Sequence, residues 1–222
     1  ESDKKDIEFG VSKGFDFIAM SFVRSRENIL ELRDFLRENN APQIKIISKI
    51  ENEEALENLD EIIDETDWIM VARWDLWIEI PIETIPVVQK MMVKKCRNAG
   101  KFVIVATQML ETMIDNPIPT RAEVTDIFNA CMQKADCTML SGETTIGKYP
   151  IETVAYMSSI LSFTEKSVNY DNYKIDADFG IDNNKRDLVS RALSLASDID
   201  AKAILLFTRR WFMAKLASIM RP

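Results

Sequence analysis

The chain has 222 residues, a formal charge of −8, no histidine and only 6 glycines. The lack of histidine excludes Ser-His-Asp and Cys-His catalysis and His-ligated zinc, and so few glycines exclude GxGxxG and P-loop nucleotide sites. The acidic balance makes nucleic acid a poor partner, and no apolar run approaches the roughly 20 residues of a membrane helix. No signal peptide opens the sequence, and three cysteines without a CxxC pair indicate reduced thiols, so we expect a cytoplasmic protein.

A repeated alternation of apolar runs and amphipathic stretches predicts successive βα units. The apolar runs predict buried strands over residues 15–23, 44–50, 67–73, 101–107 and 136–141. The stretches between them predict helices over about 26–38, 53–65, 83–99, 120–133 and 150–166. Because the strands lack polar alternation, we expect a parallel sheet covered on both faces. The pattern fits an open doubly wound sheet or a TIM barrel.

The composition changes after residue 166, which predicts a domain boundary. Residues 167–184 are polar and aperiodic, so we interpret them as a linker. A second unit follows, with a helix over about 185–199, a strand from Ala203 to Phe207 and a helix from about 211. Such a unit buries little core alone, so we expect a truncated chain or a docked appendage.

Polar residues gather where each predicted strand ends, which is where βα folds place their active sites. In strand order they are Ser21 and Arg24; Lys49 and Glu51; Arg73, Asp75 and Glu79; Thr107 and Gln108; and Ser141, Gly142, Glu143 and Thr144. Their recurrence on five successive strands favours a functional site over chance placement.

Lys49 stands out because it interrupts an apolar strand and must reach the strand end or pair with a charge. Glu51 follows two residues later and projects to the same side, and Asp75 lies in an adjacent βα loop. Two carboxylates beside one lysine suit a hard divalent cation, with the lysine left for a phosphate or enolate oxygen. An ordinary Lys-x-Glu ion pair is the alternative interpretation.

Six motifs in order and spacing resemble the pyruvate kinase family. They are FDFIAMSFVR (15–24), IISKIEN (46–52), IMVARWDLWIEIP (69–81), VATQMLETM (105–113), PTRAEVTD (119–126) and MLSGETTIGKYP (139–150). The resemblance implies the fourth to eighth units of a (β/α)8 barrel. The expected fold is therefore α/β, a partial TIM barrel with parallel strands over residues 1–166. A linker (167–184) and the start of a C-terminal α/β domain (185–222) would follow.

The resemblance implies phosphoryl transfer from phosphoenolpyruvate to ADP in glycolysis, giving pyruvate and ATP. By motif match, Lys49, Thr107 and Ser141 would be catalytic, with Lys49 neutralising charge on the phosphoryl group and the enolate. Substrate would contact Lys49, Trp74, Asp75 and Thr107. Glu51 and Asp75 would hold Mg²⁺. The family also uses K⁺, but its K⁺ ligands precede the matched region.

Two departures from the family pattern bear on function. The first three barrel strands are absent, so open sheet edges would need a partner or a second copy of the chain. Tryptophan also stands where the family is expected to have glycine, at Trp68, Trp74, Trp77 and Trp211. Drift does not readily change four glycines to tryptophan, which leaves deliberate engineering, a reassigned or misread codon, or a sequence wrongly read from density. We therefore expect an enzyme that is impaired in this chain, and the alternative is a non-catalytic, engineered or degenerate partial-barrel fragment.

Overall fold

A computed structural model of the chain describes residues 2–167, 183–209 and 212–220. The first region contains α1 (Ser2–Ser12), β1 (Phe17–Met20), α2 (Arg26–Glu38), β2 (Lys45–Ile50), α3 (Glu53–Glu57), α4 (Leu59–Glu65), β3 (Trp68–Ala72), α5 (Arg73–Glu79), η1 (Ile82–Thr84), α6 (Ile85–Asn98), β4 (Phe102–Ala106), η2 (Glu111–Ile114), α7 (Arg121–Met132), β5 (Cys137–Met139), α8 (Gly142–Thr145) and α9 (Pro150–Ser167). The last two helices are α10 (Asn183–Asp198) and α11 (Phe212–Met220).

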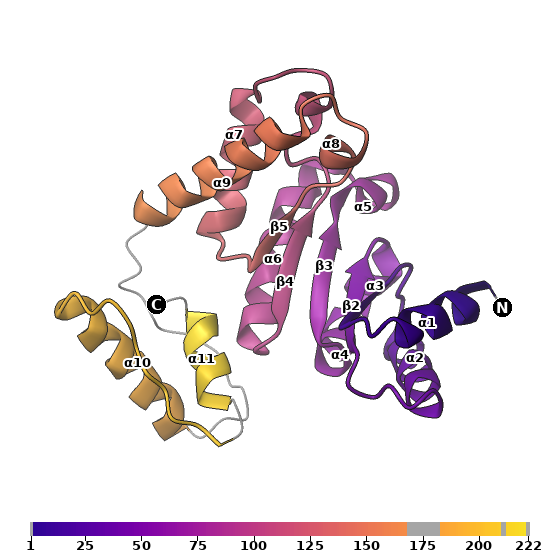
Figure 1. Cartoon of the computed structure of the whole chain (residues 1–222), viewed down its shortest axis with the longest axis horizontal. Coiled ribbons are helices and arrows are strands. Elements are labelled where there is room, and N and C mark those ends of the chain that lie inside the picture. Colours follow the sequence, from indigo (N-terminus) through magenta and orange to yellow (C-terminus); the bar gives the residue numbers. More distant parts are fainter. Residues whose placement is uncertain (1, 168–182, 210–211, 221–222) are drawn as a thin grey trace.

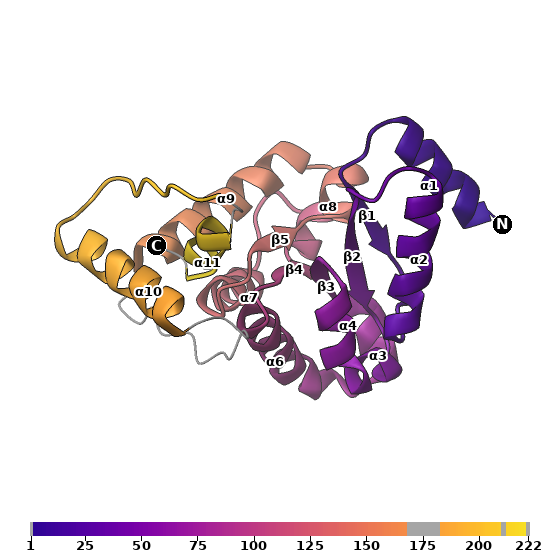
Figure 2. The same ribbon diagram turned by 90° about the horizontal axis from the view of Figure 1, so that it is seen from below.

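The five strands form one parallel sheet in chain order, β1-β2-β3-β4-β5. Helices α2, α4 and α6 lie along the same side of this sheet, as Figures 1 and 2 show together. All five predicted strands and the alternation with helices are confirmed. The sheet is the curved, incomplete arc that a partial barrel requires.

The two faces of the sheet carry different apolar clusters because side chains alternate along each strand. On the helix side, Ile46, Ile50, Ile69 and Val71 are buried in the main core. The opposite, inner face carries a smaller cluster of Met70, Ile104 and Ala106, bordered by Ile47, Trp68 and Met139. Lys49 alternates onto this inner face, which places its side chain away from the helices.

Local signals explain where several helices begin and end. Thr120 and Glu123 form a capping box at the start of α7: Thr120 N–H donates to Glu123 Oε2 at 2.7 Å, and Glu123 N–H donates to Thr120 Oγ1 at 3.3 Å. Gly100 follows α6 with φ +66°, the left-handed conformation that glycine adopts without steric cost. Pro86 lies in the first turn of α6, as predicted.

Three elements differ from the sequence prediction. The helix predicted over 53–65 is divided at Asn58, whose backbone leaves the helical region and whose Nδ2 donates to the Arg24 carbonyl at 3.0 Å. Helix α1 falls in a charged run that gave no helix prediction. The predicted strand from Ala203 to Phe207 is wrong: this run has no strand, and Phe207 is 99% exposed. An apolar run becomes a strand only where another strand pairs with it.

Helices α10 and α11 form a separate apolar cluster through Val189, Leu193, Leu216 and Met220. The predicted linker lies outside the described residues except at its ends, where Ser167 closes α9 and Asn183 opens α10. The division into domains stays a prediction. Across residues 2–167, 183–209 and 212–220, no helix has the length and apolar character needed to cross a membrane.

Candidate functional site

Lys49 and Glu51 form a tight ion pair at the carboxyl end of β2. The Lys49 Nζ lies 2.6 Å from Glu51 Oε1 and donates to Ser21 Oγ at 2.8 Å. The Glu51 side chain is only 2% exposed, whereas that of Lys49 is 25% exposed. A buried carboxylate therefore holds an ammonium group that solvent can reach, and that group can also face an anionic ligand.

Phe22 completes this cluster through its backbone. Its N–H donates to Glu51 Oε2 at 2.7 Å, so both oxygens of the carboxylate have donors. Phe22 has φ +55°, a left-handed conformation that costs a bulky residue about 1–2 kcal/mol, and its ring is exposed. The bond to Glu51 helps to hold this strained turn directly after β1.

The loop after β3 begins helix α5, whose first turn carries Trp74 and Asp75. Asp75 is half-buried. Trp74 is 47% exposed, and its ring packs edge-on against Trp77 with centroids 5.4 Å apart. The Trp74 N–H donates to Thr107 Oγ1 at 3.1 Å. The backbone amide of Trp74 therefore has a threonine hydroxyl as its hydrogen-bond partner.

Thr107 and Gln108 turn the chain sharply at the end of β4. Both are left-handed, with φ +66° and +53°, although neither is glycine. Further along this loop, Leu110 N–H donates to Glu143 Oε1 at 3.2 Å. Thr112 N–H donates to Glu123 Oε1 at 2.7 Å. Charged side chains from other elements thus fix the loop that carries Thr107.

Ser141 lies at the end of β5 and is ordered by Glu143. Its N–H donates to Glu143 Oε2 at 2.7 Å, and its carbonyl accepts from Thr145 Oγ1 at 3.0 Å. Glu143 is fully buried. Burial raises the pKa of nearby Glu111, and the Glu143 and Glu123 carboxylates raise it further. Glu143 therefore ties the ends of β4 and β5 together.

Not every strand-end residue joins the predicted site. Arg24 pairs with Glu54 at 3.6 Å on the surface, and Glu79 is exposed. Arg73 is held by a buried ion pair with Asp126 and by hydrogen bonds to the carbonyls of Ala106 and Thr107 at the end of β4. The sequence did not point to Phe22. A left-handed backbone conformation is usually signalled by glycine, and this position has none.

The donor set near β2 and β3 suits a hard cation. Glu51 follows β2 and Asp75 lies in the first turn after β3, and these two strands are neighbours. Mg²⁺ is commonly held by one or two carboxylates together with substrate oxygens and water. Within the described ranges, no group of three or more His, Cys, Asp or Glu residues is arranged to hold a metal ion.

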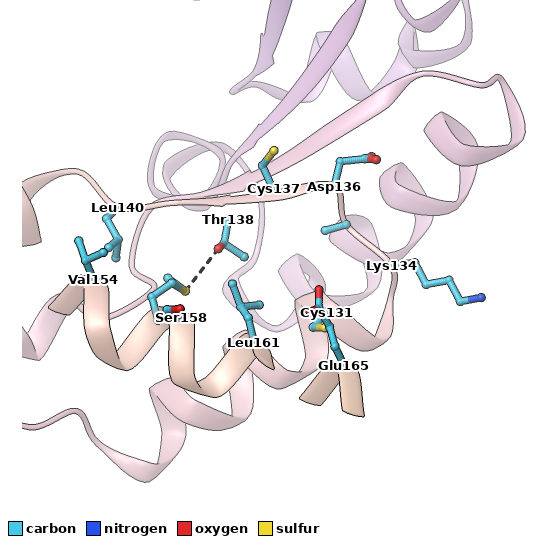
Figure 3. A pocket seen from close by; sticks show the side chains of 12 residues that line it. Cys131, Lys134, Asp136, Cys137, Thr138, Leu140, Val154, Ser158, Leu161 and Glu165 are labelled. Carbon is cyan, nitrogen blue, oxygen red and sulfur yellow. Dashed lines mark hydrogen bonds between the residues drawn. The ribbon is translucent and has the colours of Figure 1, made fainter. Parts of the chain in front are cut away.

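A pocket of about 440 Å³ lies at the other edge of the sheet, between β5, the end of α7 and α9. Figure 3 shows Leu140, Val154 and Leu161 on its wall and the 3.3 Å bond from Thr138 Oγ1 to Met157 Sδ. None of the predicted catalytic, substrate or metal residues lines it. It is therefore separate from the strand-end site.

Comparisons with known proteins match this chain to one family. The family model "Pyruvate kinase, barrel domain" matches residues 1–154. The chain belongs to the pyruvate kinase family. A pyruvate kinase of Clostridium acetobutylicum is 44% identical over 223 residues, covering 100% of this chain and 47% of its relative. One from Geobacillus stearothermophilus is 51% identical over 170 residues, covering 77% of this chain and 29% of its own length.

The fold comparison agrees with the family assignment. The crystal structure of a pyruvate kinase from Cryptosporidium parvum superimposes with a TM-score of 0.93 at 41% identity, covering 100% of this chain and 47% of that one. The sheet described above is thus part of a pyruvate kinase barrel. The chain spans between 38% and 48% of the length of the first four curated pyruvate kinases that it matches.

Proposed function

We propose that Lys49, Glu51, Asp75, Thr107 and Ser141 form part of a site that transfers a phosphoryl group from phosphoenolpyruvate to ADP. The observation that carries the proposal is the Lys49 ammonium, held 2.6 Å from buried Glu51 and 2.8 Å from Ser21 at the strand ends. This ammonium is fixed in place and reachable from solvent. Family membership supports phosphoenolpyruvate and ADP as the proposed substrates and cytoplasmic glycolysis as the proposed place of the reaction.

The proposed chemistry exchanges one P–O bond for another. The bond between phosphorus and the enol oxygen of phosphoenolpyruvate breaks, and phosphorus bonds to a terminal oxygen of ADP. Negative charge moves onto the enolate, so a fixed cation beside both oxygens lowers the barrier. Lys49 supplies this cation, because Glu51 and Ser21 hold its Nζ in one position.

The remaining residues act on the metal and on the proton. Mg²⁺, when bound by Glu51 and Asp75, supplies positive charge to the phosphate and enolate oxygens. Thr107 lies beside the first turn of α5, where its hydroxyl contacts the substrate. The enolate carbon then takes up a proton to give pyruvate, and we assign Ser141 to the proton relay. None of the described residues is assigned to K⁺.

We also propose that Trp74 impairs this site. The exposed indole of Trp74 adds bulk at the loop where the substrate carboxylate should approach the backbone. A glycine there allows closer approach. The second candidate function, a partial barrel that binds without catalysis, is favoured by the same exposed Trp74–Trp77 pair.

Pyruvate release with ADP, Mg²⁺ and K⁺, coupled to lactate dehydrogenase, tests the proposed enzyme. We expect slow release that Lys49→Met abolishes and that Trp74→Gly increases. Lys95→Met is the matched control, because Lys95 pairs with Asp60 at 2.5 Å on the surface and should leave the rate unchanged. Equal rates in Lys49→Met and the unmodified chain would overturn the assignment. No release from any variant would favour the non-catalytic alternative.

A further inference from the structure

Arg73 makes a dense set of buried contacts that the proposed reaction does not use. Its side chain is 8% exposed, and its Nη1 lies 2.5 Å from Asp126 Oδ2 on α7. Its Nε donates to the carbonyls of Ala106 at 3.2 Å and Thr107 at 3.1 Å. Its Nη2 donates to the Thr107 carbonyl as well. Two of its three nitrogens, Nε and Nη2, therefore donate to a single peptide carbonyl, that of Thr107.

That carbonyl belongs to Thr107, a strained residue beside the first turn of α5. Thr107 is β-branched yet left-handed, a conformation that persists only where surrounding contacts enforce it. On the other side of the same residue, Thr107 Oγ1 accepts the Trp74 N–H and donates to the Ala106 carbonyl at 2.6 Å. The carbonyl bound by Arg73 and the hydroxyl at the site are thus parts of one fixed unit.

We propose that Arg73 is a positioning residue that holds Thr107 in its left-handed conformation and so fixes the Thr107 hydroxyl at the first turn of α5. The consequence for substrate rests on the proposed function, because it requires Thr107 to contact phosphoenolpyruvate. The hydrogen bonds from Arg73 to the Thr107 carbonyl do not rest on the proposed function. Asp126 neutralises the guanidinium, which lets a buried cation perform this task.

Lysine cannot replace Arg73 in this role. Only the planar guanidinium fork can reach Asp126 and the Thr107 carbonyl together, whereas an ammonium is a single point charge. Arg73→Lys therefore keeps the charge and removes the grip. Arg33 offers a matched control, because its Nη2 also donates to a backbone carbonyl, Glu65 at 2.6 Å, and to Asp67 at 3.0 Å. Arg33 contacts residues that precede β3, at the opposite end of the strand from α5.

Amide hydrogen exchange at Trp74 tests the proposal without any ligand. In Arg73→Lys we expect the Trp74 amide to exchange at least about tenfold faster, because its acceptor Thr107 Oγ1 is no longer held. In Arg33→Lys we expect no change beyond the effect of global stability. Unchanged Trp74 exchange in a folded Arg73→Lys chain would overturn the proposal.

Asp126→Asn answers the same question if Arg73→Lys does not fold. This variant removes the counter-charge but leaves the bonds from Arg73 to Thr107, so the melting temperature should fall while Trp74 exchange stays within about threefold of the original. If Trp74 exchange in Asp126→Asn instead becomes about tenfold faster, as expected for Arg73→Lys, then global stability controls this amide. That result would contradict a positioning role.

Titration with phosphoenolpyruvate and Mg²⁺ separates this proposal from the proposed function. We expect Arg73→Lys to bind at least about tenfold more weakly and Arg33→Lys to bind as the unmodified chain does. Failure of both the unmodified chain and Trp74→Gly to bind would refute the proposed function, while the exchange experiment would still decide whether Arg73 holds the Thr107 carbonyl. Equal binding by Arg73→Lys and the unmodified chain would refute the positioning role alone.

Discussion

Replacement of Lys49 by methionine tests whether the Lys49–Glu51 pair is a buried electrostatic unit. The change keeps an unbranched side chain but removes the ammonium. Glu51, only 2% exposed, then keeps a single donor, the Phe22 N–H at 2.7 Å. An isolated buried carboxylate is strongly destabilising, and breaking a fully buried pair costs about 3–5 kcal/mol.

The structure sets a smaller cost in this case. The Lys49 side chain is 25% exposed, so water can replace part of the lost ammonium, and we expect a loss of about 1–3 kcal/mol. For a chain of this size that is a fall in melting temperature of roughly 2–12 °C. The double variant Lys49→Met/Glu51→Gln removes the stranded charge and should be more stable than Lys49→Met alone.

Thermal and urea unfolding followed by circular dichroism measure these differences. Lys95→Met is the matched control, because the Lys95–Asp60 pair is 40% and 77% exposed, and its loss should cost no more than about 1 kcal/mol. The reasoning is refuted if Lys49→Met is as stable as the unmodified chain. It is equally refuted if the double variant is less stable than Lys49→Met.

Three further predictions concern the loop that carries Trp74, the pH dependence of stability, and a tight turn at Gly147. Trp74→Gly should tighten binding of phosphoenolpyruvate with Mg²⁺ in calorimetry; weaker binding would contradict the proposed obstruction. Burial opposes ionisation of Asp67, but bonds from the Ile46 amide and Arg33 outweigh it and lower its pKa. Asp67→Asn should therefore cost about 1–3 kcal/mol at pH 7, and the difference should vanish as pH falls below about 4 and through the lowered pKa, measured by urea unfolding at each pH. A Cβ at Gly147 would collide with the Glu143 carbonyl, so Gly147→Ala should lower the melting temperature more than Gly142→Ala, whose nearest contact is 3.4 Å; equal effects would contradict this.

The sequence was sufficient to predict the parts of the molecule that depend on local pattern. Continuous apolar runs became the five parallel strands, and the position of Lys49 within one of them predicted a paired, strand-end ammonium. Glu51 lies two residues away, so strand periodicity alone brings the two side chains together. The helix predicted over about 26–38 is α2.

Contacts between distant residues escaped prediction. Arg73 follows β3 as the site residues do, yet its partners Asp126 and Thr107 are 53 and 34 residues away, and no sequence pattern links them. The apolar run from Ala203 to Phe207 matches a strand in composition, but none of the described residues pairs with it. Residue type fixes what a side chain can bind, whereas the packing of βα units fixes which partner it meets.

Glycine scarcity, which excluded nucleotide-binding loops, also has a local meaning. The indoles of Trp74 and Trp77 pack edge-on against each other at the loop that carries Asp75, where the family is expected to have glycine. Tandem mass spectrometry of the protein from its natural host tests whether the natural protein carries these tryptophans. Glycine at positions 74 and 77 would indicate a misread codon or a deliberate substitution, and tryptophan would show that the natural protein has these residues.

Isothermal titration of phosphoenolpyruvate tests the central claim that Lys49, Glu51 and Asp75 form a phosphoenolpyruvate and Mg²⁺ site. We predict binding that needs Mg²⁺, disappears with a chelator and is lost in Lys49→Met, while Lys95→Met binds as the unmodified chain does. Binding of equal strength in Lys49→Met, or no binding by either the unmodified chain or Trp74→Gly, would contradict the account.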